Sequence, residues 1–261
     1  MPDPKSAPDA PGHPVGIPRT PPAAERTAQG VQRMFDRVAP RYDLANTVFS
    51  LGQDKAWRQA AARATRLAAG EVAADVACGT GALTRELQSL APRAVVVGLD
   101  FSQEMLKRAR PPGGAERAPP GPPEPSRYMA GDALALPLAD ASVDVVTIAF
   151  GLRNLPEPGQ GLLEFRRVLR PGGRLVVCEF SQPVVPVFRE VYRRYLTRLM
   201  PVAARRLTSD PEAYQYLARS IGAWPDQPGL ARWLQEAGFS AVEWRDLTGG
   251  IVALHRGIAG R

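Results

Sequence analysis

One stretch, residues 72–87, constrains the fold more than any other part of the chain. It begins with a short, mostly apolar run at 72–77, and the sequence Cys-Gly-Thr-Gly follows at 78–81. The run has the length of a buried strand and ends at glycines, which allow positive φ angles and close approach of a ligand to the backbone. A strand, a glycine turn and a helix in succession bind nucleotides at the carboxyl edge of doubly wound sheets. We therefore expect a nucleotide-binding α/β domain.

The residues around this turn narrow the class of nucleotide. A dinucleotide fingerprint requires a small residue where this chain has Thr84, and a P-loop requires a lysine that is absent after Gly81. An acid, Asp100, ends a second apolar run nineteen residues after Gly81, where a carboxylate can accept both hydroxyls of a ribose. A turn without a phosphate cradle suits an adenosine ligand that has no pyrophosphate, of which S-adenosylmethionine is the common example. The alternative is a tight strand–helix connection that binds no ligand.

Strand and helix patterns alternate through most of the chain. Five strand–helix units in succession predict a parallel sheet with right-handed crossovers, and two final strands predict a hairpin at its edge. The helix expected before the last parallel strand should end at a turn formed by residues 170–173. The expected strands are 72–77, 94–99, 127–130, 143–150, 174–180, 241–247 and 250–255, and the expected helices include 54–68, 81–90, 102–109, 158–169 and 228–237.

Composition divides the chain into a tail, a domain and two insertions. Residues 1–29 contain eight prolines and almost no large apolar side chain, so we expect this tail to be disordered. The domain then spans 30–261 and begins with helical segments, which often form a lid over the carboxyl edge of such a sheet. Residues 111–126 are a proline- and glycine-rich insertion, expected to be a mobile loop, and residues 184–224 are a helical insertion.

Composition also excludes several classes of protein. No run of eighteen apolar residues could span a membrane, and the N-terminus lacks the apolar core of a secretory signal, so we expect a cytoplasmic protein. The two cysteines, Cys78 and Cys178, end expected buried strands, which favours small core residues over a disulfide or a metal site. The net charge of +7 is compatible with an anionic membrane, with nucleic acid or with simple solubility.

Polar residues follow the expected strands at their carboxyl ends, where open α/β sheets bind ligands. Asp132 and Ala133 can flank an adenine, with the carboxylate near the exocyclic amine and the backbone N–H near a ring nitrogen. The alternative for Asp132 is to cap its loop. We expect Asp75 to order the glycine turn by accepting backbone N–H groups. Arg153 and Asn154 follow the fourth strand, beside the expected cofactor site.

Segments spread over residues 31–257 resemble the class I S-adenosylmethionine-dependent methyltransferases. More narrowly, the chain is similar to the C-methyltransferases of menaquinone and ubiquinone biosynthesis. The motifs at 150–154 and 220–255 discriminate this family, whereas all class I methyltransferases share the glycine turn. The matching segments are 38–46, 75–81, 98–102, 148–154, 170–175, 179–183, 216–221 and 249–255.

This resemblance implies a Rossmann-like class I methyltransferase fold, a mostly parallel seven-stranded sheet with an antiparallel C-terminal hairpin strand and an N-terminal helical lid. It implies S-adenosylmethionine as cofactor. Two departures from the family pattern are Ala82, where many members carry an acid, and Ala149, where some carry serine; either can weaken one cofactor contact. The implied cofactor-binding residues are Thr80, Asp100, Asp132 and Ala133, together with Asp75, Gly79 and Gly81 of the turn segment.

The resemblance implies methylation of a ring carbon of demethylmenaquinol or, as a close variant, of the ubiquinone precursor; we favour the former. An aromatic carbon is a poor nucleophile unless an adjacent hydroxyl loses its proton, so the site must stabilise a developing phenolate. Arg153 is the candidate, oriented by Asn154; its alternative is a structural ion pair or loop hydrogen bond. Tyr42, Asp43 and Asp54, in the lid, are candidate contacts to the quinol ring.

Residues 184–206 bear on the substrate tail. Apolar side chains at helical spacing among arginines are typical of a core or dimer face whose charges are solvated. The alternative is a helix that covers a polyprenyl tail at the inner face of the membrane while its arginines meet anionic lipid. No base-stacking motif accompanies the charge, so we expect no nucleic-acid partner. The apolar set is Phe188, Val191, Tyr192, Tyr195, Leu196, Leu199 and Met200, and the arginines are Arg189, Arg193, Arg194, Arg198, Arg205 and Arg206.

Two rival hypotheses stay open at this point. One is a methyltransferase of the same fold that acts on another small molecule or on RNA. The other is a nucleoside-binding module without catalytic activity, which would bind S-adenosylmethionine but turn over no quinol.

Overall fold

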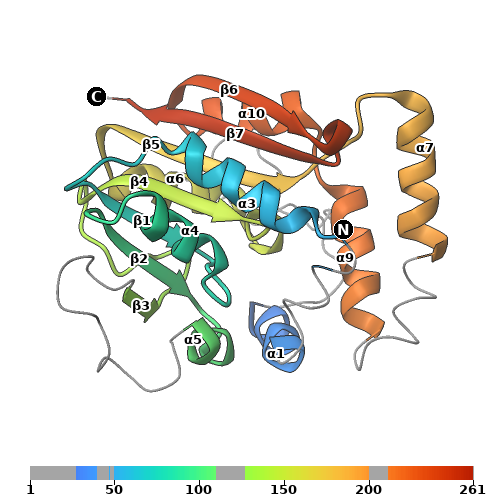
Figure 1. The fold of residues 1–261 in the computed structure, drawn as a ribbon, viewed down its shortest axis with the longest axis horizontal. Helices are drawn as coiled ribbons and strands as arrows, with labels where there is room; N and C mark the ends of the chain where they lie inside the picture. The colour runs from blue at the N-terminus through green and yellow to red at the C-terminus, as the bar shows by residue number, and fades with distance from the viewer. Residues whose placement is uncertain (1–27, 40–46, 48–49, 110–126, 200–210, 261) are drawn as a thin grey trace, which may run out of the picture.

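The computed structural model contains one mixed sheet with helices on both of its faces (Figure 1). The strand order is β3-β2-β1-β4-β5-β7-β6. The structure describes residues 28–39, 47, 50–109, 127–199 and 211–260. The strands are β1 (Val72–Val76), β2 (Val95–Asp100), β3 (Arg127–Ala130), β4 (Val143–Ala149), β5 (Leu169–Phe180), β6 (Phe239–Leu247) and β7 (Val252–Ala259). The helices are α1 (Ala28–Val38), α3 (Gln53–Ala64), α4 (Ala82–Leu90), α5 (Gln103–Ala109), α6 (Pro158–Val168), α7 (Pro186–Arg194), α9 (Pro211–Ala223) and α10 (Gln227–Glu236).

The topology confirms the predicted sheet. Strands β1 to β5 are parallel to one another, and β7 lies antiparallel between β5 and β6. The strand order reverses at β1, which pairs with β2 on one side and β4 on the other. A crevice at the carboxyl ends of strands beside such a reversal is where open α/β sheets bind ligands. In Figure 1, α1 and α9 lie on the side of the sheet to which the arrowheads of β2 and β4 point.

Two apolar cores, one on each face, hold the helices against the sheet. On one face, α3 and α4 contribute Trp57 and Leu87; on the other, α6 and α10 contribute Phe165 and Leu234. The central strands therefore bury side chains on both faces, which explains why their sequences are nearly continuous apolar runs. The rigid sheet fixes the positions of the loops at its carboxyl edge.

The structure differs from the sequence-based expectation in a few places. Residues 170–173 do not form a turn outside the sheet, because β5 already begins at Leu169 and includes them. The β4–β5 register shifts between Val143 and Val145, and Gly172 has a φ of 80°, so this part of β5 is irregular. Helix α1 begins at Ala28, inside the expected tail. The proline-rich insertion at 111–126 lies outside the described residues.

Candidate active site

The glycine turn after β1 adopts a conformation that depends on its glycines. Gly79 and Gly81 have φ angles of 56° and 76°, in the left-handed region that side chains disfavour. A Cβ on Gly81 would meet the ring of Tyr128 at less than 3 Å, whereas a Cβ on Gly79 would meet nothing within 4 Å. The turn is therefore packed on one side, at Gly81, and open on the other, at Gly79.

Asp100, at the end of β2, holds this turn in place. Its two carboxylate oxygens accept backbone N–H groups, one from Gly79 at 2.8 Å and one from Ser102 at 2.8 Å. The residue is only 6% exposed, and burial raises the pKa of its carboxyl group. Asp100 thus positions the backbone of the glycine turn and also lines the adjoining cavity.

Asp75 has a different task from the one expected, and the prediction that it accepts N–H groups of the glycine turn is wrong. Its carboxylate accepts the hydroxyls of Thr84 on α4 at 2.6 Å and Thr147 on β4 at 2.8 Å. The residue is 1% exposed, and burial raises its pKa to about 6. Asp75 joins three elements of the core, and Thr84, which breaks the dinucleotide fingerprint, is one of its partners.

A cavity of about 130 Å³, here called the Asp100 cavity, lies beside the glycine turn. Three of the residues predicted to bind the cofactor, Asp100, Asp132 and Ala133, line it, and Val31 and Phe35 of α1 contribute to its wall. Two hydrogen bonds fix α1 there: Gln32 donates to the carbonyl of Phe101 at 2.9 Å, and Ser102 donates to Asp36 at 2.5 Å. The predicted N-terminal lid is confirmed for this helix.

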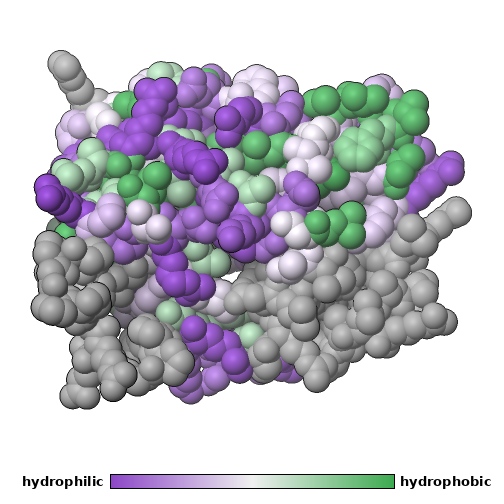
Figure 2. Space-filling model, viewed as in Figure 1, coloured by the Kyte–Doolittle hydropathy of each residue, from purple (hydrophilic) through white to green (hydrophobic). Residues whose placement is uncertain are grey.

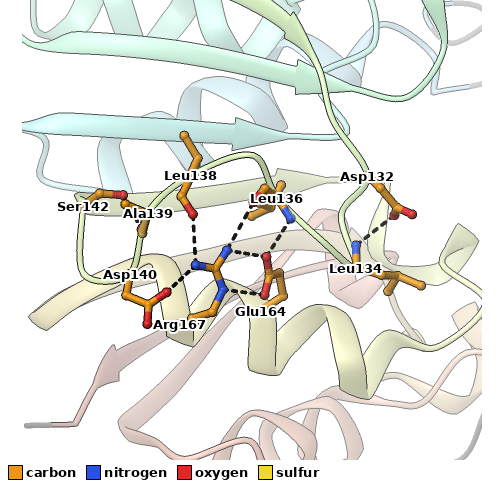
Figure 3. Close-up of polar contacts among 9 residues, drawn as sticks. All are labelled: Asp132, Leu134, Leu136, Leu138, Ala139, Asp140, Ser142, Glu164 and Arg167. Carbon is orange, nitrogen blue, oxygen red and sulfur yellow. Dashed lines mark hydrogen bonds and ion pairs between the residues drawn. The ribbon is translucent and has the colours of Figure 1, made fainter.

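The loop that carries Asp132 is anchored from α6 (Figure 3). Asp132 accepts the N–H of Leu134 at 2.9 Å, so the capping role is present alongside its place in the cavity wall. Glu164 accepts the N–H of Leu136 at 2.6 Å, and Arg167 donates to the carbonyl of Leu138 at 2.9 Å. Arg167 also bonds Glu164 at 2.6 Å, which closes the network. Sequence reasoning missed these two α6 residues, because their loop partners lie about thirty positions away in the chain.

Arg153 and Asn154 lie together on the short turn after β4 but line different cavities. Arg153 is 6% exposed, and its Nη1 lies 2.8 Å from Oε1 of Glu179, so the structural ion pair considered as an alternative is present. Its Nε has no hydrogen-bond partner in the described part of the chain. Asn154 donates to the carbonyl of Phe150 at 3.0 Å and lines the Asp100 cavity.

A second cavity of about 530 Å³, here called the α7 cavity, opens beside Arg153. Phe150 lines both cavities, and its φ of 57° places an aromatic residue in the left-handed region, a strain that is typical of functional sites. The rings of Trp57 and Phe180 lie 5.9 and 5.0 Å from the Phe150 ring, centre to centre. Apolar residues dominate the walls, among them Trp57, Phe150, Phe180, Phe188, Val191 and Ile221.

Helix α7 is not part of the core. Phe188 is 36% exposed and Val191 is 57% exposed, and no described residue of α7 is buried. Of the predicted core or dimer face, the core is therefore wrong for α7, whereas the dimer face stays a prediction. Beyond α7, Leu196 does pack against Ile221. Figure 2 shows hydrophobic side chains gathered on the surface over α7.

Of the three lid residues that the sequence suggested as contacts to the substrate, the structure describes one. Asp54 is 5% exposed and lines the α7 cavity, while Tyr42 and Asp43 lie outside the described residues. Of the wider apolar and basic set, Phe188, Val191, Tyr192, Tyr195, Leu196 and Arg194 line the α7 cavity. The side chains of Arg198, Leu199, Met200, Arg205 and Arg206 lie outside the described part.

Comparison with known proteins identifies a family and individual proteins to which the chain is similar. The model of the ubiE/COQ5 methyltransferase family matches residues 23–259. A demethylmenaquinone methyltransferase from Mycobacterium marinum is 51% identical over 235 residues, which cover 90% of this chain and 96% of the relative. A protein of the same name from Corynebacterium kroppenstedtii is 50% identical over 231 residues, with 88% and 95% covered.

Solved structures of lower identity share the fold. A SAM-dependent methyltransferase from Thermotoga maritima superposes with a TM-score of 0.59 at 18% identity, covering 87% of this chain and 99% of that one. Human N-acetylserotonin methyltransferase, solved in complex with SAM, gives a TM-score of 0.61 at 18% identity, with 91% and 60% covered. At this identity the likeness concerns the fold alone.

Proposed function

Because this chain belongs to the ubiE/COQ5 methyltransferase family, we propose that it methylates a ring carbon of demethylmenaquinol. S-adenosylmethionine is the methyl donor. The observation that carries the proposal is the pair of cavities that meet at Phe150: one is lined by carboxylates at a glycine turn, and the other is large and apolar. The reaction requires two neighbouring cavities of different chemistry, because S-adenosylmethionine is a charged nucleoside and the quinol is an apolar ring with a polyprenyl tail.

The residues of the Asp100 cavity fit the donor. The Asp100 carboxylate is buried and already oriented by two backbone N–H groups, which suits it to accept hydroxyl hydrogens of a ribose. Asp132 and Ala133 line this cavity and could flank an adenine, on a loop that hydrogen bonds from α6 hold in place. Gly79 leaves open the space that a side chain would fill. When bound, the donor supplies an electrophilic methyl group on a sulfonium sulfur.

The α7 cavity fits the acceptor. Its aromatic walls can hold a flat ring, and a bound ring would displace water from them, which would place the reactants in contact and reduce solvent reorganisation. Arg153 would stabilise the negative charge that develops on the ring oxygen, through donors that its ion pair with Glu179 leaves available. The buried Glu179 fixes the guanidinium against the ring of Phe180, 5.0 Å away.

We further infer that the protein meets its substrate at an anionic membrane surface. No helix in the described ranges is long and apolar enough to cross a bilayer. Val187 and Val191 are 75% and 57% exposed on α7, and Val191 also lines the α7 cavity. Three arginines accompany one glutamate on this helix. Such a helix can insert its apolar face among lipids while its cations meet phosphates. A polyprenyl tail could then enter the cavity without crossing water.

Transfer of a labelled methyl group tests the proposal. Purified protein would receive methyl-labelled S-adenosylmethionine with demethylmenaquinol, with the benzoquinol precursor of ubiquinone, or with a polar phenol. We expect label in the first quinol at a rate at least about ten-fold above the others, a difference of about 1.4 kcal/mol in transition-state stabilisation. Faster labelling of the benzoquinol would move the function to ubiquinone synthesis. Labelling of the polar phenol alone, or of none, would overturn the proposal.

A further inference from the structure

A third, smaller cavity of about 50 Å³ lies at the glycine turn, and we call it the turn cavity. It shares Gly79 and Phe150 with the Asp100 cavity. A ligand whose nucleoside occupies the Asp100 cavity and whose chain passes Gly79 would therefore enter the turn cavity. In S-adenosylmethionine, the part that lies beyond the ribose is the amino acid chain, which ends in an α-amino and a carboxylate group.

Two charged side chains line the turn cavity, Asp75 and Arg58. The Asp75 carboxylate is already engaged with two threonine hydroxyls and is 1% exposed, and a second anion would be repelled by it. Arg58 is the basic residue among the described residues that line this cavity. A ligand carboxylate there requires a cation, and a guanidinium is the side chain best matched to carboxylate geometry.

Arg58 is held in place from behind. Its guanidinium forms an ion pair with Asp54, one helical turn earlier on α3, and Asp54 also accepts the hydroxyl of Ser50 at 3.1 Å. The Arg58 side chain is 19% exposed and the Asp54 side chain 6%. This bond uses one of five guanidinium N–H donors, so the group can bond a second carboxylate as well. Asp54, expected from sequence to contact substrate, is better placed as the residue that orients Arg58.

We propose that Arg58, positioned by Asp54, binds the carboxylate of the methionine part of S-adenosylmethionine. The inference rests on the proposed function only in taking that molecule as the ligand. Arg58 also lines the α7 cavity, so the same guanidinium stands between the donor and the acceptor space. It would thus fix the donor chain at the point where the two reactants meet.

Calorimetry with two ligands separates this contact from a structural role. The probes are S-adenosylmethionine and decarboxylated S-adenosylmethionine, which lacks only the carboxylate. In Arg58→Gln, we expect affinity for S-adenosylmethionine to fall about ten-fold or more, because a charge-assisted hydrogen bond is lost. Affinity for the decarboxylated ligand should stay the same or rise. That ligand carries only positive charges, and the variant lacks the positive charge of Arg58 that would repel them. Asp54→Asn should give a smaller loss, again only for S-adenosylmethionine.

Arg63→Gln is the matched control, because Arg63 lies on the same helix but outside all three cavities described here. It should change neither affinity. Equal losses for both ligands in Arg58→Gln, or no loss for either, would overturn the proposal. If wild-type protein bound neither ligand, the donor assignment itself would fail along with this inference; if it bound both and Arg58→Gln did not discriminate between them, the Arg58 contact alone would fail.

Discussion

Three carboxylates at the carboxyl edge of the sheet show how burial and partners assign different tasks to one side-chain type. Asp75 bonds hydroxyls inside the core, Asp100 bonds backbone N–H groups and faces a cavity, and Glu179 is paired with Arg153. Each has a raised pKa because of burial, yet only Asp100 lines the Asp100 cavity. Sequence position alone could not separate these tasks, since all three acids lie at or near strand ends.

Replacement of the single residue Asp100 tests whether the Asp100 cavity binds the donor. Asp100→Ala removes the acceptor for the Gly79 N–H and the expected acceptor for the ribose hydroxyls. We expect binding of S-adenosylmethionine to weaken by about 1–3 kcal/mol, measured by calorimetry. Glu236→Ala, an exposed acid at the end of α10, is the control and should bind normally. Unchanged affinity in Asp100→Ala would remove this carboxylate from the site.

The buried Asp75 should make stability depend on pH. Its pKa is raised from 3.8 to about 6, so the folded protein binds this proton more tightly than the unfolded chain. Its contribution to the free energy of unfolding is therefore largest below pH 4 and falls as pH rises towards 6, by on the order of 2–3 kcal/mol. Asp75→Asn lacks this titration, so the stability difference between wild type and variant, from urea unfolding, should narrow or reverse across that window. Parallel pH profiles would contradict the prediction.

Arg153 is expected to act in turnover and not in donor binding, because it lines the α7 cavity. Arg153→Gln should lower kcat about a hundred-fold while the Kd for S-adenosylmethionine changes little. Since this change leaves Glu179 buried without its partner, the double variant Arg153→Gln, Glu179→Gln removes both charges. The loss in kcat should persist in the double variant. Recovery there would show that Arg153 matters only as the partner of Glu179.

At the scale of elements, α7 is the helix whose behaviour the sequence left most open. Its apolar spacing fits a core helix as well as a surface one, because periodicity reports a face and not what covers it. The structure leaves that face exposed beside the α7 cavity. The helices and strands of the sheet were predicted to within a few residues, whereas the start of β5 at 169 was missed because Pro171 and Gly172 signal a turn as readily as an irregular strand.

Charging the exposed face of α7 tests membrane contact. Val187→Asp should reduce co-sedimentation with anionic phospholipid vesicles several-fold, because a carboxylate opposes insertion and repels the lipid headgroups. Turnover of a long-tailed quinol in vesicles should fall, while turnover of a short-tailed quinol in solution should not. Leu90→Asp on α4, where the leucine is 46% exposed, is the matched control.

Two results would contradict this account of α7. Vesicle binding that is equal in Val187→Asp and wild type would exclude the helix as the membrane contact. A wild-type dimer that Val187→Asp converts to a monomer, with vesicle binding unchanged, would identify the face as an interface between two copies of the chain.

At the scale of the whole molecule, the sheet and the site were predictable to different degrees. The alternation of apolar runs and helix signals predicts a parallel sheet, whereas the strand order and its reversal at β1, beside which the site lies, come from the structure. The partners of the site residues are long-range: Glu164 and Arg167 hold the loop of Asp132 across about thirty positions, and Asp75 meets Thr147 across 72. Contacts of this kind follow from the packed fold, and no local pattern indicates them.

We expect the Asp100 cavity to hold the donor and the α7 cavity to hold the quinol ring, with Phe150 in the wall of both. A crystal structure with S-adenosylhomocysteine and a short-tailed demethylmenaquinol analogue tests this expectation most directly. We expect to find the ribose at Asp100, the sulfur near Phe150, and the quinol ring on the far side of Phe150, beside Arg153. An empty Asp100 cavity, or a quinol bound away from the α7 cavity, would contradict it.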